Sequence, residues 1–360
     1  NTSIEDDVIS NNDFQFGMRD EIIDELSKKY LESSLHANAL NVNIPNEHDG
    51  HKIFDKIASD FYITSFANQV YVLFKRTFLH KLREPIATMT QIFNAIFMPV
   101  VFGSVYWDID LSQQSAYDRI SAISLAALML AFMAFDILML FPTERSIFNR
   151  EQAAGMYRPI SFYLGRTLSE MPQHSLLAAI FGAIAYWMYG LQNDANKFLK
   201  WELVLIIETN CGAGLLILFS ALSKNIEQSN LLATLFLLLF MLFDANWIAL
   251  DKIPVYWRWL TEVSFLGYAS QALMVTEYQG LTFECTQQEI DTSECLFQTG
   301  EQVLYSRGLD GVDFWQNVWI LILLTVVYRI LAYIAFWLLF RNHSPSVIIK
   351  NTFPCLKKNN

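Results

Sequence analysis

Several ionisable side chains lie within long apolar segments of this 360-residue sequence, and four of them are considered first: Asp136, Glu208, Asp244 and Arg329. An ionisable group in an apolar interior costs several kcal/mol unless it is paired or hydrated, so such residues invite a functional interpretation. We predict that the four form a polar relay that couples an inner gate to an outer gate. The alternative is hydrogen bonding between neighbouring helices, and both interpretations stay open at this point.

The sequence shows no clustered set of residues that would indicate enzyme chemistry. The six histidines are scattered at positions 36, 48, 51, 80, 174 and 343, away from any group of carboxylates, which argues against a membrane-embedded enzyme. His48 and His51 alone supply too few ligands for a metal. The sequence lacks a Gly-x-x-x-x-Gly-Lys-Ser/Thr loop, so nothing here cradles ATP phosphates. We therefore expect no catalytic residue, metal or cofactor in this chain.

Composition points to a mixture of apolar and polar regions. Hydrophobic residues make up 53% of the chain, charged residues only 17%, and the formal net charge is −11. So acidic a chain has no domain-scale basic surface, which argues against a nucleic-acid partner. Residues 1–60 hold 13 acidic against 5 basic side chains and read as an acidic cytoplasmic linker.

Six segments from residue 85 onward are long and apolar enough to cross a membrane, which takes about 20 residues. They are 87–107, 119–142, 161–190, 198–222, 226–249 and 315–340. The segment before them has a basic face and apolar residues at helical spacing, typical of an amphipathic helix on the inner membrane surface. Its apolar positions are Phe66, Val70, Leu73, Phe74, Phe78 and Leu82. The predicted fold is therefore all-α: six transmembrane helices over 85–341 after an amphipathic helix over 61–84.

The distribution of Lys and Arg gives the orientation. With the amino-terminal side inside, thirteen lie in inner segments and six in outer ones, which predicts that both termini are cytoplasmic. The tail over 342–360 is then cytoplasmic, and the long connection over 250–314 is extracellular. Its many aromatic residues favour a helix that re-enters the membrane surface or packs on the outer mouth of the bundle.

Two cysteines fall in this outer connection, on the oxidising side. We predict a disulfide between Cys285 and Cys295, which would contribute roughly 2–3 kcal/mol by the chain-entropy argument. Two free thiols or a link between subunits are the alternatives. Cys211 lies in a predicted span and Cys355 in the cytoplasmic tail, so both should stay reduced.

The inner connection between the second and third spans is charged and aromatic. It reads Glu144-Arg145-x-x-Phe148-x-Arg150-Glu151, then Gly155-x-Tyr157-Arg158-Pro159, Tyr163 and Glu170-x-Pro172. This run resembles the corresponding loop and third span of G-subfamily ABC transporters, the white/ABCG half-transporters with an ABC2 membrane domain. The resemblance extends along nearly the whole chain, including the amphipathic segment, which is similar to the family's connecting helix.

The resemblance implies a function. It implies the transmembrane half of an ATP-driven exporter that moves lipid-like, sterol-like or amphipathic small molecules by alternating access. The nucleotide-binding domain, with its ATP and Mg²⁺, would precede this region. The implied partners are that domain, a second half-transporter, membrane lipids and a hydrophobic substrate. The implied location is the plasma membrane, and a non-pumping channel or scaffold subunit is the alternative.

The resemblance also implies roles for particular residues. A coupling helix that senses the ATPase domain would contain Glu144, Arg145, Phe148, Arg150, Glu151 and Tyr157. A substrate cavity at a dimer axis would be lined by Phe132, Thr234, Leu238 and Met241. For Phe132, packing or lipid contact is the alternative. The paired leucine that plugs the outer side in multidrug members falls on Asn246-Trp247, so the gate departs from the family here.

Overall fold

The computed structural model describes residues 64–153, 156–223, 225–285 and 295–341. The chain divides into two units, Asn1–Phe61 and Tyr62–Asn360, and every described residue belongs to the second. The acidic segment predicted over 1–60 and the tail predicted over 342–360 therefore lie outside the described residues.

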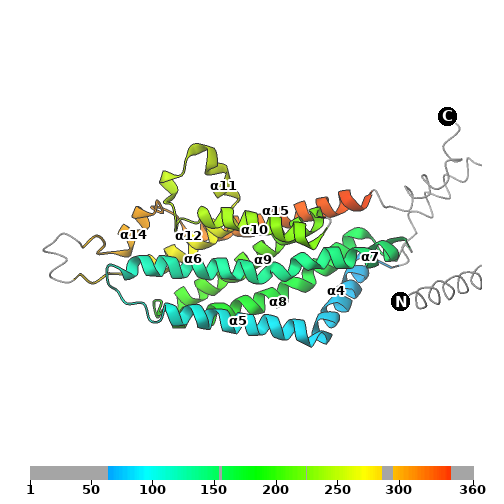
Figure 1. The fold of residues 1–360 in the computed structure, drawn as a ribbon, viewed down its shortest axis with the longest axis horizontal. Helices are drawn as coiled ribbons and strands as arrows, with labels where there is room; N and C mark the ends of the chain where they lie inside the picture. The colour runs from blue at the N-terminus through cyan, green and yellow to red at the C-terminus, as the bar shows by residue number, and fades with distance from the viewer. Residues whose placement is uncertain (1–63, 154–155, 224, 286–294, 342–360) are drawn as a thin grey trace, which may run out of the picture. The chain divides into compact units, whose positions relative to one another are not determined.

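The regular elements of the described residues are helical, and the long helices run side by side (Figure 1). The first half contains α4 (Phe66–Arg83), α5 (Pro85–Val105), α6 (Ser115–Met133), the 3₁₀ helix η1 (Ala134–Met139), α7 (Leu140–Ala153) and α8 (Pro159–Met188). The second half contains α9 (Ala195–Leu222), α10 (Ile226–Leu242), η2 (Leu250–Lys252), η3 (Val255–Trp257), α11 (Arg258–Val263), α12 (Phe265–Tyr278), α14 (Gly300–Ser306) and α15 (Phe314–Arg341). The predicted all-α fold is confirmed.

Local sequence explains where several helices begin. Pro85 and Pro159 occupy first helical positions, where the missing N–H costs nothing and the fixed φ suits the helix. Asp194 caps α9 by accepting a hydrogen bond from the Asn196 backbone N–H at 2.9 Å. Ser264 caps α12 in the same way, because its hydroxyl accepts from the Gly267 N–H at 3.0 Å.

Helix α9 lies at the centre of the bundle and packs against α8, α12 and α15. Its middle carries Gly212, Ala213 and Gly214, and the last of these lies against Tyr328 and Arg329 of α15. Almost all of α12 is buried as well. The connection predicted over 250–314 thus contributes a packed helix to the bundle rather than an exposed loop.

In the part of the chain that the structure describes, four helical segments are long and apolar enough to cross a membrane: Thr88–Val105, Ser115–Met139, Ala195–Leu222 and Phe314–Leu338. They correspond to the first, second, fourth and sixth predicted spans. The third is the 30-residue α8, whose first turns carry Arg166 and Glu170. The fifth is α10, an apolar helix of 17 residues.

The fifth predicted span, 226–249, is longer than the helix that forms there. Helix α10 ends at Leu242, and a turn follows in which Ala245 adopts a φ of 69°. Asp244 stabilises this turn, because its Oδ1 accepts a hydrogen bond from the Asn246 backbone N–H at 2.9 Å. A short polar side chain that bonds its own backbone competes with the helix, so the apolar run outlasts the helical backbone.

Helix α4 forms where the amphipathic helix was predicted, and its buried face overlaps the predicted apolar face only in part. Gln69, Leu73 and Thr77 are buried, whereas Leu82 is 61% exposed. The buried face packs against α8 at Gly165, where an added Cβ would lie 2.8 Å from the Leu73 Cβ. The two helices therefore meet at backbone distance, which hydropathy spacing alone does not indicate.

Candidate functional site at the connecting-helix end

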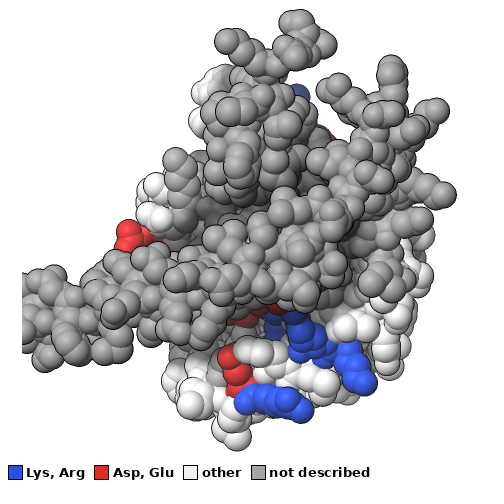
Figure 2. Space-filling view, turned by 90° about the vertical axis from the view of Figure 1, so that its right-hand side faces the viewer, with Lys and Arg blue, Asp and Glu red and all other residues white. Residues whose placement is uncertain are grey.

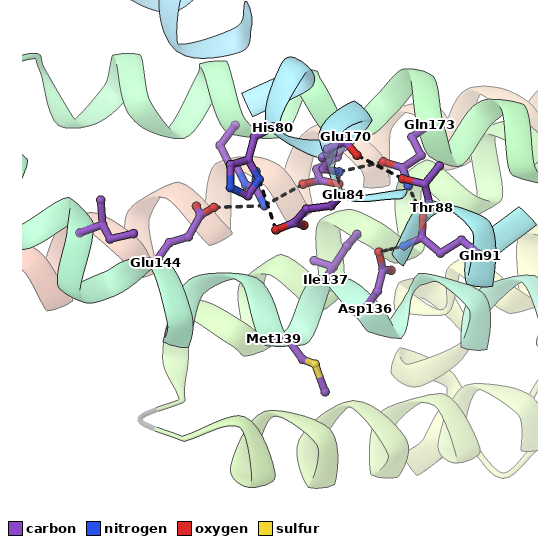
Figure 3. Close-up of a pocket in the computed structure, with 13 residues that line it drawn as sticks. His80, Glu84, Thr88, Gln91, Asp136, Ile137, Met139, Glu144, Glu170 and Gln173 are labelled. Atoms are coloured by element: carbon purple, nitrogen blue, oxygen red, sulfur yellow. Dashed lines mark hydrogen bonds and ion pairs between the residues drawn. The ribbon is translucent and has the colours of Figure 1, made fainter. Parts of the chain in front are cut away.

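A polar cavity of about 470 Å³ lies where α4, α5, η1, α7 and α8 meet (Figure 3). Its charged lining includes Glu84, Asp136, Glu144 and Glu170 on the acidic side, and Lys81 and Arg166 on the basic side. Seen from this end of the bundle, the uncovered surface also shows basic and acidic side chains next to one another (Figure 2). Both α4, the predicted amphipathic helix, and α7, which contains the predicted coupling residues, contribute to this lining.

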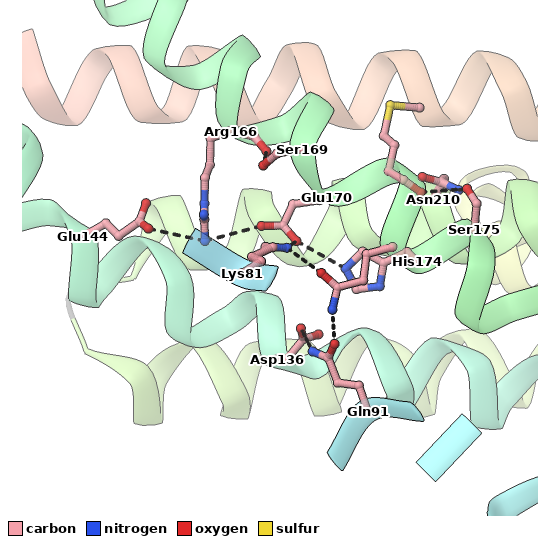
Figure 4. A network of polar contacts seen from close by, with 12 residues as sticks. Lys81, Gln91, Asp136, Glu144, Arg166, Ser169, Glu170, His174, Ser175 and Asn210 are labelled. Carbon is pink, nitrogen blue, oxygen red and sulfur yellow. Dashed lines mark hydrogen bonds and ion pairs between the residues drawn. The ribbon is translucent and has the colours of Figure 1, made fainter. Parts of the chain in front are cut away.

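Glu170 of α8 is the centre of the cluster, and it is only 2% exposed (Figure 4). Lys81 of α4 donates to its Oε2, and Arg166 Nη2 lies 3.4 Å from its Oε1. His174 Nε2 lies 3.6 Å from Oε2. A buried carboxylate needs such partners, because an unpaired charge in the interior is strongly destabilising.

Arg166 joins two helices. Besides Glu170, its Nη2 lies 3.3 Å from the Oε1 of Glu144 on α7. One guanidinium group therefore bridges a carboxylate of the predicted coupling helix and a carboxylate of α8. Because Glu144 is partly buried, loss of hydration raises its pKa above the ordinary value of a glutamate, although the nearby Arg166 opposes this.

Two glutamines extend the cluster to α5 and η1. The Oε1 of Gln173 accepts from Lys81 Nζ at 3.1 Å, and its amide N–H donates to Gln91. Gln91 in turn donates to Asp136 (Figure 4). Each amide accepts on one side and donates on the other, so the chain has one consistent direction from Lys81 to Asp136.

The far end of α7 is held by a second contact with α4. Arg76 donates to both carboxylate oxygens of Glu151, at 2.8 and 3.2 Å, and the Tyr157 hydroxyl donates to the same group at 2.5 Å. Burial alone would raise the pKa of Glu151, but the hydrogen bonds from Arg76 and Tyr157 outweigh it and lower that pKa. Phe148 fills the space beneath, 4.8 Å from the Phe162 ring and 5.0 Å from the Phe336 ring.

Glu144, Phe148, Glu151 and Tyr157, four of the six predicted coupling residues, thus contact α4, α8 or α15 through the described interactions. Arg150 is exposed on α7. The side chain of Arg145 lies outside the described residues. The sequence predicted a helix here but did not predict its contacts with Arg76 and Arg166. It also did not predict the adjoining cluster, although polar residues inside apolar spans were a usable signal; its members are Lys81, Gln91, Glu170 and Gln173.

The structure separates the four residues of the predicted relay. Asp136 joins the cluster through Gln91, whereas Arg329 Nη2 lies 3.4 Å from the backbone oxygen of Asn210. Glu208 is fully buried, and neither of its carboxylate oxygens has a hydrogen-bond partner in the described part of the chain. Asp244 lies in the turn after α10. Within the described residues, no hydrogen bond or ion pair joins any two of the four.

The predicted cavity residues lie at or near the surface of the single chain. Leu238 is 52% exposed, and Phe132, Thr234 and Met241 are half-buried. The Phe132 ring packs 5.2 Å from that of Phe135. Of the four, Met241 lines a described cavity, a smaller one at the opposite end of the bundle.

That opposite end carries the predicted disulfide, and Cys285 and Cys295 are bonded. Cys211 is buried and free, as predicted. An unforeseen buried ion pair lies nearby, with Arg119 Nη1 2.5 Å from the Oε1 of Glu277. The remaining N–H groups of Arg119 reach backbone oxygens, including that of Ile109 at 2.5 Å, so this buried charge is well satisfied.

In the described residues, no group of three or more His, Cys, Asp or Glu side chains is arranged to hold a metal ion. The charged side chains around Glu170 are paired with one another: Lys81, Arg166 and His174 lie next to its carboxylate, and Arg166 also reaches Glu144.

The sequence is similar to a known family and to several known proteins. The family model described as ABC-2 type transporter matches residues 68–278. The chain is 28% identical over 324 residues to ABC transporter G family member 1 of Dictyostelium discoideum, covering 88% of this chain and 40% of that protein. It is also 28% identical over 244 residues to ABC transporter G family member 7 of Arabidopsis thaliana, covering 68% of this chain and 33% of that protein. The chain spans less than half the length of each.

Proposed function

The chain belongs to the ABC-2 type transporter family, and from this premise we propose that it is the transmembrane half of an ATP-driven exporter of lipid-like, sterol-like or amphipathic small molecules. It is an integral membrane protein. In the proposal, a nucleotide-binding domain of the same transporter binds ATP and Mg²⁺, and a second half-transporter completes the dimer. Both termini face the cytoplasm of a plasma-membrane protein.

The observation that carries the proposal is the position of Arg166 between Glu144 and Glu170. Helix α7 would receive the movement of the ATPase domain. Arg166 links α7 to Glu170 of α8, and Lys81 links α4 to the same Glu170 carboxylate. A displacement of α7 would therefore move α4 and α8 with it. The glutamine chain would pass the displacement on to α5 and η1.

The substrate would enter between two protomers. Phe132, Thr234, Leu238 and Met241 support this assignment by lying at or near the chain surface, where a second copy could complete a cavity. Alternating access then means that the substrate pathway opens alternately at the end with the polar cluster and at the opposite end, beside the turn that follows α10. The relay assigned to Asp136, Glu208, Asp244 and Arg329 would act through intervening groups rather than by direct contact.

The test uses the full-length transporter in proteoliposomes, with ATP-driven uptake of a fluorescent NBD-phosphatidylcholine as the readout. Glu144→Gln is expected to lower uptake about tenfold while ATP hydrolysis continues, because the link between α7 and Arg166 is lost. The matched control is Glu227→Gln, an exposed acidic residue of α10. ATP-independent leakage of the lipid by the wild-type protein would instead favour a non-pumping channel or scaffold.

A further inference from the structure

The second cavity, of about 260 Å³, lies between the end of α5, one face of α6 and the turn after α10. Its apolar walls are Leu125, Leu128 and Met241, and aromatic rings of Tyr106 and Trp247 complete it. Its volume is just below the range of about 300–1,000 Å³ typical of small-molecule sites. A cavity of this size accepts one end of a ligand.

Two buried side-chain oxygen atoms without a described hydrogen bond belong to residues that line this cavity. Asp244 is only 1% exposed, and its Oδ2 has no hydrogen bond in the described structure, although its Oδ1 does. Ser124 is 3% exposed, and its hydroxyl, also without a described hydrogen bond, lies near enough to interact with the same carboxyl group. Among the described residues, no salt bridge involves Asp244. Buried polar groups are nearly always satisfied, so these atoms call for a partner.

The backbone holds this carboxylate in a fixed position. Its other oxygen, Oδ1, accepts from the Asn246 N–H at 2.9 Å, and the Asn246 carbonyl accepts from Arg307 Nη1 at 2.7 Å. Ala245, between Asp244 and Asn246, has a φ of 69°, a left-handed conformation that is unfavourable for a residue with a Cβ. Observed strain of this kind is concentrated at functional sites.

We propose that this cavity binds the ammonium end of an amphipathic organic cation, with Asp244 Oδ2 as its counter-ion and the Ser124 hydroxyl as an acceptor. The apolar walls take the hydrocarbon next to the ammonium group. A single carboxylate in apolar surroundings favours a cation, since an unpaired buried charge is costly. This inference rests on the proposed export function, whose substrate class it narrows, and it gives Asp244 a role as a ligand-binding group.

The test measures equilibrium binding, which needs no ATP. Dansylcadaverine, which carries a free amine, and its neutral N-acetyl derivative are the matched probes, followed by fluorescence anisotropy. The protein is the full-length transporter in phosphatidylcholine nanodiscs, since a zwitterionic bilayer does not attract the amine. Wild-type protein is expected to bind the amine about tenfold or more tightly than the acetylated probe, as a charge-assisted hydrogen bond implies.

Asp244→Asn is expected to weaken binding of the amine about tenfold and to leave the acetylated probe within about twofold. Ser124→Ala should show a smaller loss of the same kind. The control is Asp118→Asn. Asp118 is on α6, the helix that carries Ser124, but it does not line the cavity. Equal affinity of wild-type protein for both probes, or equal loss of both in Asp244→Asn, would overturn the proposal.

The comparison of probes on wild-type protein needs no variant, so it remains decisive even where Asp244→Asn fails to fold. The two proposals also fail separately. Amine binding that depends on Asp244, without ATP-driven lipid uptake, would contradict export and support the site. Lipid uptake by a protein that does not distinguish the two probes would support export and overturn the site.

Discussion

Arg166 on α8 lies 3.3 Å from the carboxylate of Glu144 on α7, and it is the same nitrogen that faces Glu170 one helical turn further along α8. The arginine is 8% exposed, so both pairs act in a region from which water is largely excluded. Ion pairs of this kind are sensitive to loss of one partner, since the other is then left buried and uncompensated.

Replacement of Arg166 by methionine should therefore be severe. The variant keeps much of the side-chain volume but leaves Glu170 with Lys81 and His174 alone and Glu144 without its ion pair. We expect a loss of about 3–5 kcal/mol in the free energy of unfolding, the range for breaking a buried pair. Thermal unfolding in nanodiscs measures it.

The matched control is Arg150→Met, because Arg150 is an exposed basic residue on the neighbouring helix. It should change the unfolding free energy by about 0.5 kcal/mol or less, as most surface substitutions do. Equal stability of Arg166→Met and Arg150→Met would contradict the bridging role of Arg166.

Gln69 should prove to be a capping residue for a helix other than its own. Its Oε1 accepts from the Arg158 backbone N–H at 3.1 Å and from the Ser161 hydroxyl at 3.0 Å, at the start of α8. Gln69→Ala should cost about 0.5–2 kcal/mol, the value of a lost N-cap, and expose the first turn of α8 to amide exchange. Hydrogen exchange of residues 158–162 provides the measurement.

Lys75→Ala is the control for Gln69→Ala, since Lys75 is exposed on the same helix. Faster exchange confined to the Gln69 variant is the expected result. Unchanged exchange at the start of α8 in both variants would show that the cap contributes nothing.

The pair of Arg76 and Glu151 should make stability depend on acid. The pKa of Glu151 is lower in the folded chain than its ordinary value of 4.5, so its contribution is complete above about pH 4.5 and is lost as the pH falls through the lowered pKa. The pair is partly exposed, which limits the effect to about 1 kcal/mol or less. Thermal unfolding of wild type and Glu151→Gln between about pH 3 and pH 6 tests it.

Glu144, on the same helix, should make stability depend on pH in the opposite direction. Burial raises its pKa, so the folded state holds its proton at a pH where the unfolded state has released it, and stability falls as the pH rises above 4.5. Glu144→Gln should remove that decline, whereas Glu151→Gln should remove the loss in acid. Identical pH profiles for the two variants would refute both assignments.

The disulfide should contribute to the packing of the region around α14. Cys285 and Cys295 are ten positions apart, and the neighbouring Gln113 accepts from the Phe297 N–H at 2.9 Å. Replacing both cysteines by serine should cost roughly 2–3 kcal/mol by the chain-entropy argument. Unfolding of the oxidised, reduced and double-serine proteins compares the three states.

The reduced wild-type protein and the double-serine variant should unfold at the same midpoint, below that of the oxidised protein. Non-reducing electrophoresis supplies the control, because an intrachain bond leaves the apparent mass of the chain unchanged. A disulfide-linked dimer that disappears in the double-serine variant would be the contrary result.

Sequence reasoning succeeded where local pattern decides structure. The apolar runs predicted helices, and two of these helices begin at Pro85 and Pro159, within about two residues of the predicted spans. It failed at the fifth span, because hydropathy continues past Leu242 while the Asp244 turn ends the helix. Hydropathy reports the environment of a segment, not the backbone conformation within it.

The polar cluster shows a second limit. Lys81 and Glu170 are 89 positions apart, so nothing local in the sequence pairs them. The motif Glu170-x-Pro172 was noticed, but its partner on α4 depends on how closely α4 and α8 approach. The relay predicted among Asp136, Glu208, Asp244 and Arg329 was inferred from residue type alone, and their helices place them in separate surroundings.

Gly165 leaves no room between α4 and α8 even for a methyl group, since an added Cβ would also lie 3.1 Å from the Phe74 backbone nitrogen. The close packing of α4 on α8 therefore depends on the absence of a side chain at position 165. A methyl group there would push the two helices apart, because backbone atoms on α4 cannot yield as a side-chain tip can. It would thereby separate Lys81 from Glu170, which lie about one to two helical turns away. Transporters that share this crossing should be intolerant of every side chain at that position, however small and apolar.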